Sequence, residues 1–140
     1  MKKTAIILAL IFIAGSSLFS QTLKKGNLVG FHVGVIELAP GVTMEQYRDF
    51  CMHKLLPAYN KEFEGDIKVL VAGGERGVYQ NFMSRIMIIK SLKVRNKYFP
   101  EEGKSSDLMK SKMAKIQPLI DELEKLGTFK EDHYTDWVVQ

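Results

Sequence analysis

The segment at residues 28–38 constrains the fold most, because it has the pattern of a β-strand with two apolar faces. Its residues alternate between the faces, with Phe31, Val33 and Val35 on one side and His32, Gly34, Ile36 and Leu38 on the other. A strand that is apolar on both faces is expected to be covered on both sides. A later predicted strand, residues 80–90, is equally apolar at its centre. We therefore expect both faces of the sheet to be shielded from water.

A helix is predicted directly after this strand. The Pro40-Gly41 turn ends the strand, and Thr43 with Gln46 has the spacing of a capping box that starts a helix. One buried stripe follows at helical spacing: Tyr47, Phe50, Cys51, Leu55, Tyr59 and Phe63. Pro57 removes one backbone hydrogen bond, so we expect a kink or a break after residue 56 and an end near residue 65.

The rest of the chain predicts further strands and helices. Strands are expected at residues 67–72, 80–90 and 133–139, and a glycine-rich reversal at residues 73–77 joins the first two. Ser91 is positioned to cap a short helix that ends before Pro100, and Ser106 to cap a longer one that Gly127 closes. The order strand, helix, strand, strand, helix, strand is that of the α+β, ferredoxin-like βαββαβ fold.

This fold places both helices on one face of a four-stranded antiparallel sheet and leaves the other face open. Because the strands are apolar on both faces, an open face would expose large side chains to water. The economical cover is the same face of a second copy, so we expect a homodimer whose two sheets close into an α+β barrel.

The first residues have the composition of a secretory signal peptide. A basic start at Lys2 and Lys3 precedes a short apolar run and then small residues up to Ser20. The run is shorter than a transmembrane helix needs. We therefore expect a signal peptide at residues 1–20, a single domain at residues 21–140, and a periplasmic or secreted product with no stable membrane insertion after cleavage. No cysteine lies near the expected cut, which disfavours a lipid anchor.

Composition excludes several partners. Removing Lys2 and Lys3 lowers the formal net charge from +4 to +2, which is too small a bias to indicate nucleic acid. The single cysteine, Cys51, has no partner within the chain, so the core rather than disulfides must stabilise the domain. We expect Cys51 to be a small buried residue; a disulfide across the dimer and a reactive thiol are the alternatives.

Two stretches resemble a known family. The stretch "VIELAPGVTMEQYRDFCMHKLLPAYNKEFEGDIKVLVAGG", residues 35–74, is similar to the opening of the dimeric α+β-barrel superfamily, especially its NIPSNAP-like branch, and "SLKVRNKYFP", residues 91–100, to a short helical segment there. The superfamily includes stress-responsive A/B-barrel proteins, antibiotic-biosynthesis monooxygenases, haem-degrading enzymes and polyketide cyclases. Its fold therefore does not decide the function.

The resemblance implies a use for His32. In stress-responsive and cyclase-like members a histidine on the first strand faces the cavity, and His32 falls at a comparable place. Gly34, next on the same face, would leave room for a ligand beside the imidazole. His32 is then a candidate general base or polar clamp, because its charge changes near neutral pH. The alternative is a structural histidine, bonded to a group across the strands or on the dimer partner.

Other candidates are weaker. Arg85 could bind a carboxylate in the cavity, or form a salt bridge at the dimer or an exposed edge. Ile36, Met87 and Trp137 are candidate lining residues, with Leu38 beside them. The methionines suit core packing better than metal binding, and His53 is poorly spaced from Cys51 for a shared metal. The haem-degrading set of asparagine, tryptophan and histidine is not matched. We expect neither a metal nor a cofactor.

Two functions remain open. As a binding module, the exported dimer would hold a small apolar or aromatic molecule in its cavity, with His32 orienting it. As a cofactor-independent, monooxygenase- or cyclase-like enzyme, it would use His32 as general base. A second polar group beside His32 would favour the enzyme. A barrel filled by side chains would instead leave the function to the outer surface.

Overall fold

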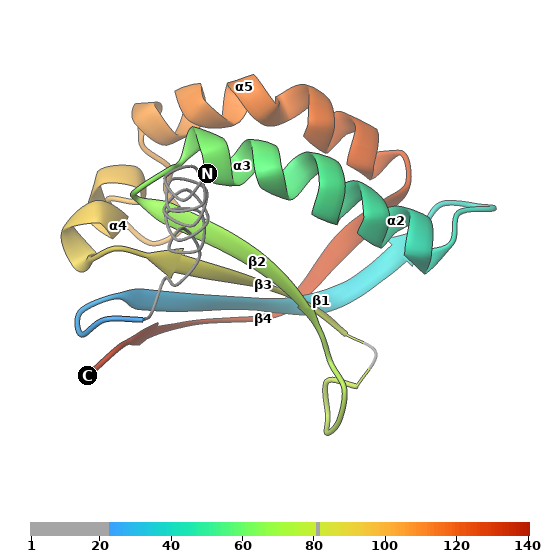
Figure 1. The fold of residues 1–140 in the computed structure, drawn as a ribbon, viewed down its shortest axis with the longest axis horizontal. Coiled ribbons are helices and arrows are strands. Elements are labelled where there is room, and N and C mark those ends of the chain that lie inside the picture. The colour runs from blue at the N-terminus through green and yellow to red at the C-terminus, as the bar shows by residue number, and fades with distance from the viewer. Residues whose placement is uncertain (1–22, 81) are drawn as a thin grey trace, which may run out of the picture.

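The computed structural model describes residues 23–80 and 82–140 and has a mixed α+β architecture (Figure 1). Four strands are formed: β1 (Leu28–Leu38), β2 (Ile67–Gly73), β3 (Met83–Ile89) and β4 (Gly127–Val138). The helical elements are α2 (Met44–Phe50), η1 (Cys51–Leu55), α3 (Leu56–Glu62), α4 (Leu92–Tyr98) and α5 (Asp107–Glu124). The signal peptide expected at residues 1–20 lies outside the described residues.

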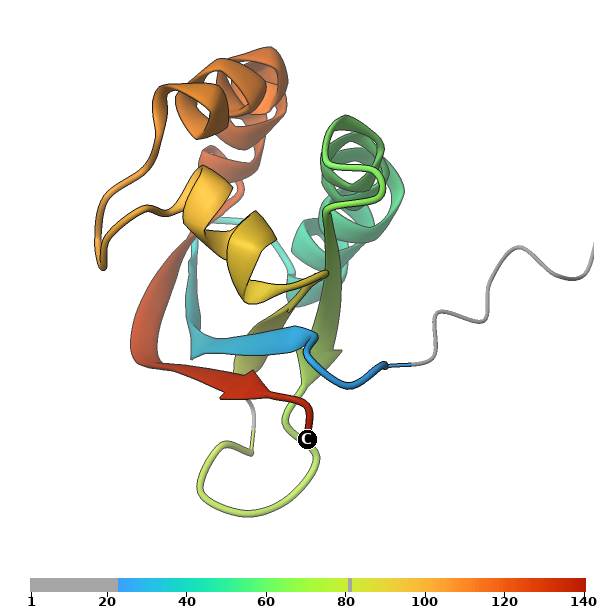
Figure 2. The ribbon, with the colours of Figure 1, turned by 90° about the vertical axis from the view of Figure 1, so that its left-hand side faces the viewer.

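The strands form one antiparallel sheet in the order β2-β3-β1-β4. The helices lie on one face of this sheet, with α5 running beside α2 and α3 (Figures 1 and 2). This arrangement is compatible with the expected ferredoxin-like fold.

The first helical segment follows the predicted capping pattern. The Thr43 hydroxyl accepts from the backbone N–H of Gln46, and the Gln46 side chain accepts from the backbone N–H of Thr43. The break expected near Pro57 takes the form of a π-helical turn, η1, between α2 and α3. Pro57 lies in the first turn of α3, where a missing backbone N–H is tolerated. The π-helical turn therefore accommodates Pro57, and the helix continues as α3.

Two predicted strand boundaries were wrong. The third strand begins at Met83 rather than at residue 80, because Tyr79 and Gln80 belong to the turn after β2. The last strand begins at Gly127 rather than at residue 133, and it pairs with β1 along the whole length of β1. Gly127 therefore starts a strand instead of closing the helix, which ends at Glu124.

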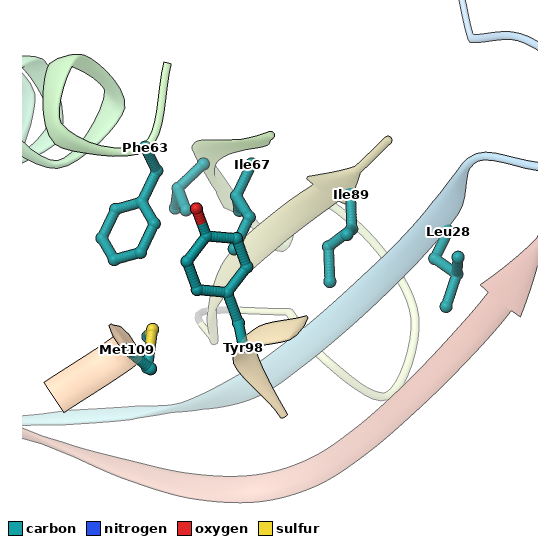
Figure 3. Packing of buried hydrophobic residues seen from close by; sticks show 7 residues of the cluster. Leu28, Phe63, Ile67, Ile89, Tyr98 and Met109 are labelled. Atoms are coloured by element: carbon teal, nitrogen blue, oxygen red, sulfur yellow. The ribbon is translucent and has the colours of Figure 1, made fainter. Parts of the chain in front are cut away.

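The core lies between the sheet and the helices. One buried cluster is shown in Figure 3, where Phe63 and Tyr98 pack over side chains of the sheet with their ring centroids 5.5 Å apart. Its buried members are Leu28, Phe63, Ile67, Val69, Ile89, Tyr98 and Met109. A second cluster, built on Tyr47, Cys51 and Met83, packs against Ile36 and Leu38. Even-numbered β1 residues therefore face the helices.

The opposite face of the sheet, here called the open face, is apolar. Because residues directly opposite in antiparallel strands share a face, the register assigns its apolar members: Val29, Phe31, Val33, Val35, Leu70, Ile86, Ile88 and Trp137. The same register places Lys68, Ser84, Lys130 and Thr135 among them. Val35, Leu70 and Trp137 are 38%, 39% and 61% exposed. No helix of the described chain covers this face (Figure 2).

Asn60 protects the edge strand β2, and its loss is expected to destabilise the fold. Its amide donates to the carbonyl of Val69 at 3.0 Å and accepts from the Val69 N–H at 2.7 Å. We predict that Asn60→Ala lowers the free energy of unfolding by about 1 to 3 kcal/mol, because two hydrogen bonds are lost. Urea unfolding measures this change. The exposed Asn96→Ala on α4 is the control, and an equal effect of the two variants would contradict the role of Asn60.

Candidate functional site

A cavity of about 310 Å³ lies between the sheet and the helices. Its wall is mostly apolar and draws on all four strands and on α2, η1, α3 and α5. The lining includes His32, Tyr47, Cys51, Tyr59, Val71, Met83, Arg85, Met87, Met113 and Phe129. A cavity of this size is at the lower end of the range of small-molecule sites.

His32 is held between two residues of β4. Its Nδ1 lies 2.5 Å from Oε2 of Glu131, and its ring lies 4.6 Å from the ring of Tyr134. An ionised carboxylate has no proton to donate, so Nδ1–H donates to Glu131, and in the neutral form of the ring Nε2 is left as an acceptor. His32 thus bonds across the strands, as the structural alternative expected. It also lines a cavity inside the protomer, on the helix-covered face, and not the dimer cavity in which it was predicted.

A β-bulge brings both of these partners to His32. The register of β1 with β4 shifts between Val33 and Gly34, so Val33 pairs with His133 while Gly34 pairs with Glu131. Without this extra residue, strict alternation would place Glu131 and Tyr134 on opposite faces of β4. The bulge therefore lets both reach the helix-covered face on either side of His32.

Arg85 supplies the positive charge of the cavity. It pairs with His32 across β1 and β3, and its guanidinium lies 4.1 Å from the ring centre of Phe129. Its Nη2 atom lies 3.8 Å from Oε2 of Glu131, which is too long for a hydrogen bond. Within the described part of the chain, no side chain forms a hydrogen bond with this guanidinium, so its donors are available to a ligand.

Neutral hydroxyl and thiol groups stand on the helical wall. Burial raises the pKa of Tyr47 to about 12, of Tyr59 to about 12 and of the Cys51 thiol to about 11. The nearby positive charge of Arg85 opposes this shift at all three residues. These groups are protonated at neutral pH, so the wall opposite the sheet carries hydrogen-bonding groups without charge.

The structure brings together three of the predicted site residues: His32, Arg85 and Met87 all line the cavity. Ile36 and Leu38 instead pack in the second core cluster. Gly34 leaves no room for a ligand, because a Cβ there would lie 2.1 Å from the carbonyl oxygen of Lys130. Trp137 is on the open face, opposite Val29, because the bulge and the register fix its side of the sheet.

Two kinds of site residue were missed. Glu131 was overlooked because it precedes residue 133, where the last strand was expected to start, and Tyr134 because its pairing with His32 was not foreseen. Tyr47 and Tyr59 were expected to be buried, but only as core residues. The helical stripe was the available signal for the tyrosines, whereas nothing local marks Glu131 as a partner of His32.

No group of three or more histidine, cysteine or acidic residues within residues 23–80 and 82–140 is arranged to hold a metal ion. His53 is exposed and lies 3.5 Å from Asp49. No helix in the described part of the chain is long and apolar enough to cross a membrane.

Comparisons with protein-family models, with curated proteins and with solved structures find no match to this chain. The site must therefore be interpreted from its own geometry, which is that of an α+β protein with a cavity between sheet and helices.

The raised pKa values predict a loss of stability at alkaline pH. In the unfolded chain Cys51 ionises near its ordinary pKa of 9.0, but in the folded protein its pKa is about 11. Between these values the unfolded state has lost a proton that the folded state keeps, so rising pH favours unfolding. The free energy of unfolding should fall by about 2 to 3 kcal/mol per fully shifted group.

Urea unfolding at a series of pH values from 8 to about 11 measures this fall. Cys51→Ala should reduce its slope above pH 9.0, whatever its effect on stability at neutral pH. An unchanged slope in this variant would show that the Cys51 thiol does not contribute.

Proposed function

We propose that the protein binds a small apolar or aromatic molecule in the cavity between its sheet and helices. The observation that carries this proposal is a mostly apolar cavity of about 310 Å³ that is lined by His32 and Arg85, with Glu131 beside both residues. Ligand sites commonly combine an apolar wall with a few convergent polar groups that fix orientation. His32 and Arg85 would hold the polar end of the ligand.

The apolar part of the ligand would lie against the methionines. Met83 and Met87 line the cavity from β3, and Met113 lines it from α5. Methionine side chains adapt their shape and make favourable contacts between sulfur and aromatic rings. This lining suits an aromatic body better than a chain of polar groups.

A cofactor-independent enzyme is the second candidate. The observation that favours it is the contact between His32 and Glu131, because a base that is oriented by a carboxylate is a recurring arrangement in proton-transfer catalysis. His32 would act as general base on the bound molecule, in monooxygenase- or cyclase-like chemistry.

We also propose a ferredoxin-like homodimer of the dimeric α+β-barrel type. The strand order and the helices on one face support the ferredoxin-like part. The open face supports the dimer, because its large apolar side chains need a cover and an identical face is self-complementary in shape and chemistry. The signal-like composition of residues 1–20 further supports a periplasmic or secreted location for this dimer.

Filling the cavity should abolish ligand binding. Val71 is half-buried and lines the cavity from β2, so a tryptophan there would occupy part of its volume. We predict that Val71→Trp weakens binding of the apolar fluorescent probe N-phenyl-1-naphthylamine by at least about tenfold, since a tenfold loss is only 1.4 kcal/mol.

The matched control is Val78→Trp, in the turn after β2, where the valine is 87% exposed. Both variants are checked for folding by thermal melting. If Val71→Trp melts like the native protein and still binds the probe with native affinity, the cavity is not the binding site.

A further inference from the structure

The contact between His32 and Glu131 determines what a ligand must offer. Because Nδ1–H donates to Glu131, Nε2 of the neutral imidazole can only accept a hydrogen bond. No described residue donates to Nε2. A ligand in the cavity is therefore bound best when it presents a donor, such as O–H, to His32.

Arg85 determines what charge the ligand can carry. Its guanidinium stands one strand away from His32, is stacked on Phe129 and has free donors. Glu131 lies near both residues, 2.5 Å from the imidazole and 3.8 Å from the guanidinium. A ligand oxyanion at Arg85 would therefore complete an alternating row of charges: Glu131, protonated His32, ligand oxygen and Arg85.

A ligand carboxylate suits the position between His32 and Arg85 less well than a ligand hydroxyl. A carboxylate is already ionised in neutral water, so it brings no proton for Nε2 and places a full second negative charge near Glu131. A weakly acidic hydroxyl brings its own proton. On binding, the ligand O–H bond breaks, an Nε2–H bond forms on His32, and the electron pair stays on the ligand oxygen beside Arg85.

We infer that the ligand is a weak acid, with an aromatic or apolar body and a phenol- or enol-type hydroxyl, and that it is bound as its oxyanion with the proton on His32. This inference depends on the proposed function, since it names the class of molecule that the cavity holds. It requires neither an oxidant nor a cofactor, because only a proton moves.

Three probes with the same nitrophenyl body test it: 4-nitrophenol, 4-nitrotoluene, which has no acidic proton, and 4-nitrobenzoate. The nitrophenolate anion absorbs visible light that the neutral phenol does not, so ionisation of the bound probe is seen directly. We expect bound 4-nitrophenol to become half-ionised about one pH unit below the free compound, as a nearby positive charge would cause. It should also bind more tightly than either analogue.

The other outcomes separate the two proposals. Equal binding of 4-nitrophenol and 4-nitrotoluene, without the anion band, would overturn the inference and leave the proposed function standing. Tightest binding of 4-nitrobenzoate would also overturn it, in favour of a carboxylate held by Arg85. Failure of all three probes to bind at millimolar concentration would count against the proposed function itself.

Variants identify the proton acceptor. His32→Gln should return the pH at which the bound probe is half-ionised to that of the free compound or above it, because the amide cannot take the proton. Glu131 is 41% exposed, so Glu131→Gln should fold normally and return the ionisation of the bound probe toward that of the free compound. His53→Gln, at an exposed histidine on η1, is the control and should behave as the native protein. A bound probe that is still half-ionised about one pH unit below the free compound in His32→Gln would overturn the assignment of the proton to His32.

Discussion

Replacing Gly34 with alanine is expected to destabilise the protein by about 3 to 5 kcal/mol, the range of the most severe point substitutions. A Cβ at this position would lie 2.1 Å from the carbonyl oxygen of Lys130 and 3.0 Å from the Cα of Glu131. Both are backbone atoms, so no side-chain rotation can relieve the overlap. β1 and β4 would have to separate at the bulge.

The same separation would damage the site. Glu131 reaches His32 only because β4 approaches β1 closely at Gly34. Gly34→Ala should therefore weaken ligand binding even under conditions where the variant remains folded. Urea unfolding and probe binding measure the two effects.

The control is Gly73→Ala at the end of β2, where an added Cβ meets nothing within 4 Å. This change should alter stability by less than about 1 kcal/mol, and can be slightly favourable because alanine loses less conformational freedom on folding. Similar effects of the two substitutions would contradict the close approach of β4 at the bulge.

Placing a charge at the centre of the open face is expected to convert a dimer into folded monomers. Ile86 pairs with Phe31 of β1 on one side and with Leu70 of β2 on the other, so Ile86→Lys puts an ammonium in the middle of the apolar surface. In a symmetric dimer both copies would bury this unpaired charge. The penalty of several kcal/mol corresponds to a rise in the dissociation constant of at least about a thousandfold.

Sedimentation velocity at micromolar concentration distinguishes the two states. Ile86 is only half-buried in the protomer and points away from the helices, so the variant should keep its fold and its cavity. Leu108→Lys on α5 is the control, because that leucine is 40% exposed on a helix outside the open face. A native protein that sediments as a monomer would contradict the dimer proposal.

Local signals were sufficient to predict much of the framework. The alternating pattern of β1, the capping box at Thr43 and the serine caps at Ser91 and Ser106 each depend on neighbouring residues, and each is present in the structure. The π-turn was predicted only as an irregularity near Pro57, because no local sequence pattern distinguishes its wider hydrogen bonding from that of an α-helix.

The site was less predictable, because long-range strand pairing builds it. The first half of β4 is charged and has little alternation, so only its pairing with β1 makes it a strand. The bulge between the two strands then decides that Glu131 and Tyr134, rather than Trp137, share a face with His32. Residue type was enough to identify His32 and Arg85 as candidates. It was not enough to identify Glu131, which lies beside both of them.

The most direct test of the ligand site is native mass spectrometry of the protein purified from its own host, with the Val71→Trp variant measured in parallel. We expect the native protein to carry a small molecule that is released on denaturation. We expect the Val71→Trp variant, whose cavity is filled, to carry none. A native protein that shows only the mass of its own polypeptide, as the variant does, would contradict the claim that the cavity between sheet and helices is a ligand site.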